Sequence, residues 1–258
     1  MGTGAITPYI DVAQITLYLF WVFFAGLIYY LHRENKREGY PLETDGPGTI
    51  DVQGWPAVPR AKTYRLQHGG SVDAPVRKVS PQTLAAAPAG GWVGAPLVPT
   101  GNPMLDGVGP GAWADRADVP DLTYEGLPKI VPLRADPSHG VADGDPDPRG
   151  MVVVGADGVE AGTVCDLWVD RSDVLFRYLE VELAPAPAQA AGRVLLPINF
   201  CRIGTHQVRV RSILGGQFAQ VPATRQADQI TFLEEERIVA YYGGGTLYAT
   251  PQRQEPLL

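Results

Sequence analysis

A run of twenty uncharged residues near the start of the chain constrains its fold more than any other feature. Residues 12–31 read VAQITLYLFWVFFAGLIYYL. At about 1.5 Å rise per residue, a helix of this length spans about 30 Å, which is the thickness of the hydrocarbon core of a bilayer. A helix satisfies its own backbone hydrogen bonds, so it is stable in lipid without water. The sequence therefore predicts one membrane-spanning helix over residues 12–31.

The charges that flank this run predict its orientation. Residues 1–11 contain no Lys or Arg, whereas Arg33, Lys36 and Arg37 follow the run closely. Basic residues gather on the cytoplasmic side of membrane helices, so we expect the N-terminus outside and the rest of the chain in the cytoplasm. The alternative is a secretory signal peptide, which needs a basic start, a shorter apolar core and a cleavage site of small residues. The start here is neutral to acidic and the core is longer, which favours an anchor.

Composition and motifs exclude several classes of function. The net charge of −7 argues against a nucleic-acid partner, which requires a basic face. The two cysteines lack zinc spacing, and we expect a cytoplasmic body to keep them reduced. The four histidines are too scattered to form a metal site; they are His32, His68, His139 and His206. The motifs GxSxG, HExxH and GxxxxGKS/T are absent, so we do not expect a hydrolase or transferase, and the cysteines and histidines predict no metal site in this chain alone.

Residues 41–150 form a loop-rich segment that holds 17 of the 24 prolines. Proline and glycine interrupt any helical pattern every few residues, and only Thr63–Leu66 and Ile130–Leu133 resemble strands. The segment is either a disordered linker or an ordered segment that lies on a partner. Trp55, Trp92 and Trp113 favour the ordered alternative, because a solvated linker rarely contains such residues.

The remainder of the chain predicts a mainly β domain with one helix. Residues 151–222 contain short β-branched runs separated by turns, which is typical of a small antiparallel barrel or sandwich. In residues 175–183, alternation places Leu175 and Leu179 on one face and Glu180 on the other. Residues 231–242 predict a helix that Thr231 and Glu234 cap, and we expect Gly243–Gly245 to end it.

One stretch between two of these strands contains grouped carboxylates. DLWVDRSDVLFRY places Asp166, Asp170, Asp173 and Arg177 around a strand–turn–strand. An arginine so placed needs a carboxylate partner, and Asp170 or Asp173 is close enough in sequence to provide one. Grouped carboxylates repel one another, so such a group can retain a proton toward neutral pH and relay it to a buried acceptor. The alternative is a solvated turn with a surface salt bridge.

Several motifs together resemble one known family over nearly the whole chain. They are HRENKREGYPLE after the apolar run, PTGNPM with GVGPGAW, DGDPDPRG, GTVCDLWVDRSD, RYLEVEL, and EEERIVAYYGGGTLYAT. This set is similar to the H subunit of the photosynthetic reaction centre of purple bacteria. The resemblance implies a pigment-free subunit that caps the cytoplasmic face of the L and M core subunits. It further implies shielding of the quinone sites and assistance in proton delivery to the secondary quinone.

The resemblance also implies an organisation for the chain. Residues 1–11 would be periplasmic, 12–31 would span the membrane, 32–130 would form a juxtamembrane and loop-rich segment packed on partner subunits, and 131–258 would form a cytoplasmic PRC-barrel domain with a C-terminal helix. The compartment would be the bacterial inner membrane, in its intracytoplasmic or chromatophore form. Expected partners are L, M, membrane lipids, light-harvesting antenna proteins and a cytochrome subunit. The complex, rather than this chain, would contain bacteriochlorophyll, bacteriopheophytin, quinones and non-haem iron.

The resemblance assigns residues as well. Asp170, Asp173, Arg177 and Lys129 match positions near the proton route of the family, with Asp173 where a Glu is often found. Some relatives have two surface histidines just before that lysine, where this chain has Glu125 and Leu127, so proton uptake is expected at Glu125 or at other carboxylates. Contacts with the membrane interface, lipid or the core are expected from Tyr30, Arg33, Arg37 and Tyr40.

Two functions of other classes compete with this interpretation. One is a membrane-anchored cytoplasmic enzyme, which should have a deep pocket lined by the residues of its own domain. The other is a single-pass PRC-barrel module tethered for assembly or binding, which should be stable as an isolated soluble domain.

Overall fold

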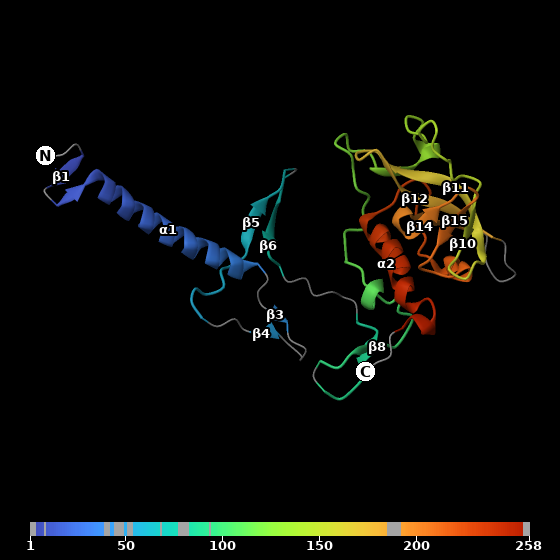
Figure 1. Ribbon diagram of the computed structural model, residues 1–258, viewed down its shortest axis with the longest axis horizontal. Helices are drawn as coiled ribbons and strands as arrows, with labels where there is room; N and C mark the ends of the chain where they lie inside the picture. Colours follow the sequence, from blue (N-terminus) through green and yellow to red (C-terminus); the bar gives the residue numbers. More distant parts are fainter. Residues whose placement is uncertain are drawn as a thin grey trace. The chain divides into compact units, whose positions relative to one another are not determined.

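The computed structural model describes residues 4–7, 9–38, 42–43, 49–50, 54–67, 69–76, 83–92, 94–184 and 192–254. The chain divides into two compact units (Figure 1). The first unit holds residues 1–79 and 92–94, and the second holds residues 80–91 and 95–258.

A long helix, α1, dominates the first unit and covers Val12–Arg37 (Figure 1). Asp11 caps its first turn, because its carboxylate accepts a hydrogen bond from the backbone N–H of Gln14 at 2.7 Å. An 18-residue window of this helix has a mean hydropathy of 1.8, and none of the window is buried. Within the described residues, α1 is the one helix long and apolar enough to cross a membrane, as the sequence predicts.

Polar contacts extend α1 beyond the apolar run, as far as Arg37. The Glu34 carboxylate binds the Arg37 guanidinium at 3.0 Å and the Lys62 ammonium at 2.5 Å. Lys36 donates to the backbone carbonyl of Pro56 at 2.7 Å. Basic side chains also suit the partial negative charge at the C-terminal end of a helix. The last turn of α1 is therefore fixed by the segment that follows it within the same unit.

Short antiparallel strand pairs make up the other regular structure before the main sheet. In the first unit these are β1 (Ala5–Thr7) with β2 (Ile10–Asp11), β3 (Leu42–Glu43) with β4 (Thr49–Ile50), and β5 (Lys62–Arg65) with β6 (Ser71–Ala74). In the second unit, β7 (Ala86–Pro88) pairs with β8 (Leu97–Pro99). The strand expected at Thr63–Leu66 corresponds to β5.

A curled seven-stranded sheet forms the centre of the second unit (Figure 1). The strand order is β13-β12-β11-β10-β15-β14, and β9 pairs with β11. The strands are β9 (Ile130–Pro132), β10 (Val152–Val154), β11 (Glu160–Asp170), β12 (Leu175–Leu183), β13 (Arg193–Pro197), β14 (Cys201–Ile203) and β15 (Gln207–Val210). All neighbours are antiparallel except β10 and β15. The predicted mainly β domain with a C-terminal helix is confirmed.

Two bulges bend the central strand pair. In the register of β11 and β12, Cys165 and Arg177 each have no residue opposite them. A bulge increases local twist and turns the side chain of the extra residue in a new direction. The sheet therefore curls into a half-barrel, and β11 pairs with β10 at its start and with β9 at its end.

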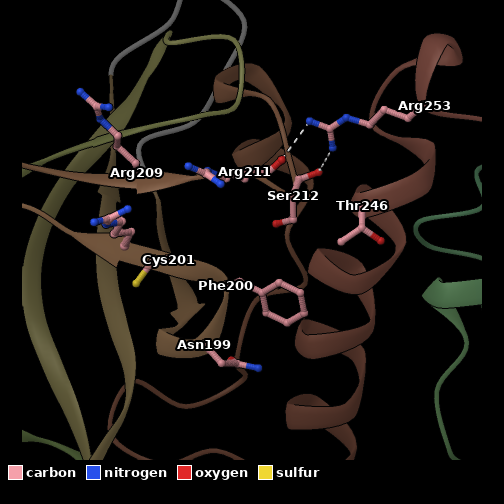
Figure 2. A pocket seen from close by; sticks show the side chains of 9 residues that line it. Asn199, Phe200, Cys201, Arg209, Arg211, Ser212, Thr246 and Arg253 are labelled. Carbon is pink, nitrogen blue, oxygen red and sulfur yellow. Dashed lines mark hydrogen bonds between the residues drawn. The ribbon is translucent and has the colours of Figure 1, made fainter.

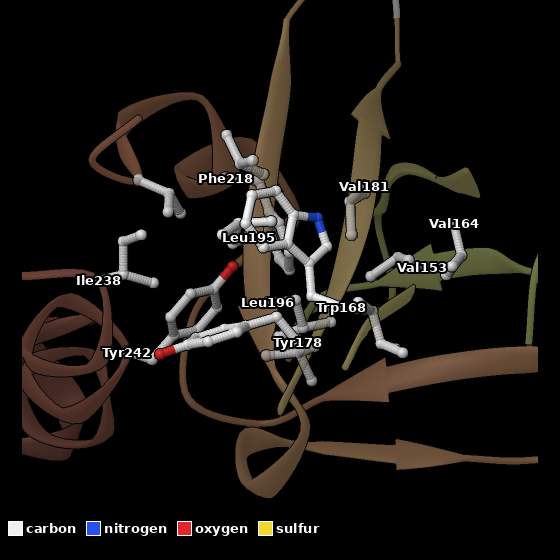
Figure 3. Close-up of a cluster of buried hydrophobic side chains, with 14 of the residues drawn as sticks. Val153, Val164, Trp168, Tyr178, Val181, Leu195, Leu196, Phe218, Ile238 and Tyr242 are labelled. Carbon is white, nitrogen blue, oxygen red and sulfur yellow. The ribbon is translucent and has the colours of Figure 1, made fainter. Parts of the chain in front are cut away.

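The hydrophobic core lies between this sheet and α2 (Phe232–Tyr248). Figure 3 shows Ile238 and Tyr242 of the helix facing Leu196 and Trp168 of the sheet. The largest side chains that are almost fully buried are aromatic: Trp168, Tyr178, Phe218, Tyr241 and Tyr242. Aromatic side chains bury the most apolar area per residue, so they stabilise this small core strongly.

The start of α2 follows the prediction and its end does not. The Thr231 hydroxyl accepts from the backbone N–H of Glu234 at 3.1 Å, and the Glu234 carboxylate accepts from the backbone N–H of Thr231 at 2.9 Å. The expectation that Gly243–Gly245 end the helix is wrong, because α2 continues to Tyr248.

Close packing explains these glycines. A Cβ on Gly244 would lie 3.2 Å from the Cα of Gly111, which belongs to the 3-10 turn η1 (Gly109–Gly111). A Cβ on Gly245 would lie 2.4 Å from the Ile213 side chain and 2.6 Å from the Ser212 carbonyl oxygen. Glycine costs a helix about 1 kcal/mol relative to alanine, and here it permits the backbone of neighbouring segments to approach.

The expected faces of β12 are also corrected. Leu175 is exposed, whereas Glu180 is 4% exposed. The Glu180 carboxylate accepts from the Trp168 indole at 2.9 Å, from Arg134 at 2.5 Å and from Arg193 at 3.3 Å. The curled sheet covers both faces of the strand, and a buried carboxylate is stable only when cations and donors surround it.

Part of the loop-rich segment packs against this domain. Residues 94–150 are described throughout, and Met104 and Val108 are buried. The Arg237 guanidinium of α2 lies 4.6 Å from the centre of the Trp113 ring. These contacts support the ordered interpretation for residues 94–150.

Candidate functional site

Four charged residues, which lie in two separate segments of the sequence, meet where β9 begins beside the end of β11. Lys129 directly precedes β9, and β9 pairs with the last residues of β11 so that Ile130 lies opposite Asp170. The Lys129 ammonium nitrogen lies 3.4 Å from Asp170, 3.7 Å from Asp173 and 3.8 Å from Asp121, each measured to Oδ2. We call these four residues the Lys129 cluster. Lys129, Asp170 and Asp173, which the resemblance assigns to the proton route, therefore lie together in the structure.

Asp170 shapes the turn of this cluster. Its side chain is 2% exposed, and Oδ1 accepts from the backbone N–H groups of Ser172 and Asp173 at 3.0 and 3.1 Å. Such an aspartate turn fixes the chain between β11 and β12. The Asp173 side chain is 54% exposed, so it is the member of the cluster that reaches the surface most freely.

Lys129 is a fixed positive charge. Partial burial opposes its ionisation, but the carboxylates of Asp170 and Asp173 outweigh this effect and raise the pKa of Lys129. The ammonium therefore stays protonated at neutral pH, so it orients the carboxylates and balances their charge.

A second polar group adjoins the cluster. The Asp136 carboxylate accepts from the Ser138 hydroxyl at 2.5 Å and from the Arg171 guanidinium at 2.8 Å, and it lies 2.9 Å from His139 Nδ1. The Ser138 hydroxyl and then Arg171 hold the pKa of Asp136 well below its usual range. Arg171 connects the two groups, because its backbone N–H donates to the Lys129 carbonyl at 2.9 Å.

An open cavity of about 480 Å³ connects this second group with solvent. Asp136, His139, Arg171 and Glu125 line it. The pKa of Glu125 is lowered by its own backbone N–H and by the Thr123 hydroxyl. The cavity thus gathers a histidine and two carboxylates beside Arg171, the residue that follows Asp170 in the sequence.

The expected partner of Arg177 is corrected by the structure. Neither Asp170 nor Asp173 pairs with it; the Arg177 guanidinium lies 3.9 Å from Glu235 Oε2 on α2. Tyr178 donates to the same carboxylate oxygen at 2.8 Å. The cause is the bulge at Arg177, which turns its side chain toward the first turn of α2.

The pKa of Glu235 is shifted in the opposite direction from that of Asp136. Burial raises the pKa of Glu235, against the opposing effects of Tyr178, Arg177 and Arg116. Asp121 also raises it, so Asp121 acts on both Lys129 and Glu235.

Exposed apolar side chains surround the Lys129 cluster. Leu122, Tyr124 and Leu127 lie on the loop before Lys129, and Val174 lies on the turn after Asp173. Each is more than half exposed. Together these side chains form an exposed apolar surface beside the charged cluster.

Three of the four residues expected at the membrane interface, Tyr30, Arg33 and Arg37, lie within the C-terminal part of α1. Tyr30 is exposed, and the Lys62 ammonium lies 5.8 Å from the centre of its ring. Arg33 lines a cavity of about 680 Å³ together with Arg37, whose guanidinium binds Glu34. Tyr40 lies outside the described residues.

Sequence reasoning missed Asp121, Asp136, His139 and Glu235 as members of the site. The spacing DPSH around Asp136 is a signal of a local aspartate turn, and it could have indicated the second group. No local pattern relates Glu235 to Arg177, since helix and strand meet only in the folded chain. The described residues include no group of three or more His, Cys, Asp or Glu that could hold a metal ion.

Two family models match the chain, one in its N-terminal half and one in its C-terminal half. Residues 4–135 match the model described as "Photosynthetic reaction centre, H-chain N-terminal region". Residues 142–217 match the model of the PRC-barrel domain, which covers β10 to β15 of the curled sheet. The first match includes α1 and the loop that carries Asp121 and Lys129.

Proposed function

Because this chain belongs to the photosynthetic reaction centre H-chain family, we propose that it caps the cytoplasmic face of the L and M core and assists proton delivery to the secondary quinone. It is a membrane-anchored reaction centre subunit of this family. The pigments, quinones and iron of the complex would be held by the core. This chain would supply binding surface, insulation from water and proton-exchanging side chains.

The proposed orientation has the N-terminus in the periplasm and the domain in the cytoplasm. Residues 1–11 have no basic residue, and Arg33, Lys36 and Arg37 follow the apolar run. The exposed apolar surface of α1 supports contact with lipid and with helices of the core. We propose that Tyr30 and Arg33 lie at the headgroup level there.

The surface beside the Lys129 cluster supports docking on a hydrophobic partner. Leu122, Tyr124, Leu127 and Val174 leave apolar area in water when the chain is alone. On a partner, this area would be buried and the cluster would be closed off from bulk water. In the first unit, Trp55 and Trp92 are also exposed and would pack on neighbouring subunits, with antenna proteins and a cytochrome subunit as further proposed neighbours.

The single observation that supports the proton role best is the contact of Lys129 with three carboxylates within 3.8 Å. The secondary quinone takes up two electrons and two protons in one cycle. Asp173 would accept a proton from water or from a neighbouring acid and release it toward the core. Lys129, which stays charged, would keep Asp170 and Asp173 close without exchanging its own proton. Hydrogen-bonded waters would bridge gaps longer than one hydrogen bond.

We propose the cavity beside Asp136 as the point of proton uptake. This chain lacks the histidine pair of some relatives, but His139 and Glu125 line the same cavity. An imidazole can both accept and release a proton, so it could collect protons from the cytoplasm. Arg171 would connect this cavity with the Lys129 cluster.

Asp173→Asn tests the proposal in the assembled complex. The amide keeps the size of the side chain but cannot exchange a proton at neutral pH, so we expect the second, proton-coupled electron transfer to the secondary quinone to slow about tenfold or more. The first electron transfer should change little. Flash-induced absorption changes of the purified complex measure both rates.

Asp143→Asn is the matched control, because Asp143 is an exposed aspartate of the same domain outside the cluster. It should leave both electron transfers unchanged. Equal second-transfer rates in wild type and Asp173→Asn would remove Asp173 from the route.

A further inference from the structure

A cavity lined by positive charge, in contrast to the acidic Lys129 cluster, lies at the β14–β15 hairpin and the end of α2 (Figure 2). Its volume is about 490 Å³. Four of its lining residues are arginines, namely Arg202, Arg209, Arg211 and Arg253. No Asp or Glu lines the cavity within the described part of the chain. This concentration of positive charge stands out in a chain with a net charge of −7.

The hairpin places like charges side by side. Arg202 of β14 lies directly opposite Arg209 of β15 in the antiparallel register. Arg211 follows two residues later, on the same face as Arg209 under strand alternation. Like charges directly opposite each other destabilise a strand pair. An anion bound between them would remove this repulsion.

Arg253 adds a positive charge whose position is fixed. It donates to three backbone carbonyls, those of Ser212 at 2.6 Å, Gly245 at 2.6 Å and Arg211 at 2.9 Å. These carbonyls hold the guanidinium in place, as the dashed lines to Ser212 and Arg211 in Figure 2 show, without neutralising its charge.

Ser212 provides an independent sign that this cavity suits a polar ligand. The residue is 5% exposed, and its hydroxyl has no hydrogen-bond partner among the described residues. Figure 2 shows its side chain directed toward the space that Arg211 and Phe200 border. A buried hydroxyl without a partner costs free energy, and such groups are usually satisfied by water or by a ligand.

We propose that this cavity binds the phosphate group of an organic phosphate, either a phospholipid headgroup or a soluble phosphate ester. Guanidinium groups match phosphate oxygens in pairs, and several of them together can contact more phosphate oxygens than a single carboxylate offers. A volume of about 490 Å³ accommodates a phosphate together with the organic group attached to it. Phe200 supplies an apolar wall for that group. This site is separate from the proton route and does not depend on it.

The test measures binding of inorganic phosphate to the full-length chain in non-ionic detergent by isothermal titration calorimetry. We expect one phosphate per chain for the wild type and for the control Arg149→Gln, since Arg149 is an exposed arginine of the same domain that pairs with Asp147. Arg209→Gln/Arg211→Gln should bind at least about tenfold more weakly, because two charge-assisted contacts are lost. Equal affinity in all three proteins, or an equal effect of chloride at the same ionic strength, would overturn the proposal.

Lipid analysis separates the two sources of phosphate. Loss of one phospholipid per chain in the double variant would assign the site to a lipid headgroup, and an unchanged lipid content together with lost phosphate binding would assign it to a soluble ester. Circular dichroism checks that the variants fold. If the double variant does not fold, Arg202→Gln and Ser212→Ala take its place, with the same expected weakening.

Discussion

At the scale of single residues, the site holds two acids in opposite environments. Asp136 accepts hydrogen bonds from Ser138 and Arg171, which stabilise its ionised form and lower its pKa. Glu235 is buried on α2 beside Tyr178, and burial raises its pKa. The first is thus suited to hold a fixed negative charge, and the second is suited to gain or lose a proton.

The raised pKa of Glu235 predicts a pH dependence of stability. Below the pKa of an unfolded glutamate, about 4.3, the folded and unfolded chains both hold this proton and no penalty arises. As the pH rises through the folded pKa, the buried carboxylate ionises and stability is lost. Glu235→Gln should abolish this loss while it keeps the hydrogen bond from Tyr178. Urea unfolding of the full-length chain between pH 4 and 8 measures the effect.

Arg177→Ala is the informative comparison for that experiment. It removes a cation that lowers the pKa of Glu235, so the loss of stability should extend to higher pH than in the wild type. Identical pH profiles for the wild type and Arg177→Ala would show that the pairing across 3.9 Å has no energetic effect.

At the scale of elements, α2 depends on glycine for packing. A Cβ on Gly245 meets the Ile213 side chain and the Ser212 backbone at distances that real contacts do not reach. Gly245→Ala should therefore lower the free energy of unfolding by about 1–3 kcal/mol, although alanine favours a helix more than glycine does. Thermal or urea unfolding measures the change.

Gly216→Ala is its control, because a Cβ there meets nothing within 4 Å. This change should alter the free energy of unfolding by less than about 0.5 kcal/mol. An increase in stability for Gly245→Ala would mean that helix propensity outweighs the close approach of the neighbouring segments.

Local patterns predicted those elements whose causes are local. The apolar run of α1 and the box of Thr231 and Glu234 each depend on residues within one or two turns, and both are present as expected. The neighbours of Gly245, the bulge at Arg177 and the burial of Glu180 depend on segments far away in sequence. Propensity and alternation cannot predict such features, because tertiary contacts determine them. The family resemblance assigned Lys129 and Asp170 to one region without predicting their contact, and the pairing of β9 with β11 explains that contact.

At the scale of the whole molecule, the region that matches the PRC-barrel model is smaller than the core it belongs to. The match covers residues 142–217. The buried core also includes Met104, Ile130, Val131, Leu133, Ile230 and three residues of α2, namely Ile238, Tyr241 and Tyr242. The curled sheet of the matched region would expose its apolar face without them. The folding unit should therefore extend from the loop-rich segment through α2.

Two fragments test this extent. Residues 95–258 contain the entire sheet and α2, so this fragment should unfold in one cooperative transition without α1. Residues 142–217 lack β9 and α2, so this fragment should show neither a cooperative transition nor protected backbone amides. Circular dichroism during heating and hydrogen exchange measure both properties. A sharp transition in the shorter fragment would mean that the sheet buries enough apolar area by itself, and that Tyr241 and Tyr242 cover a core that is already stable.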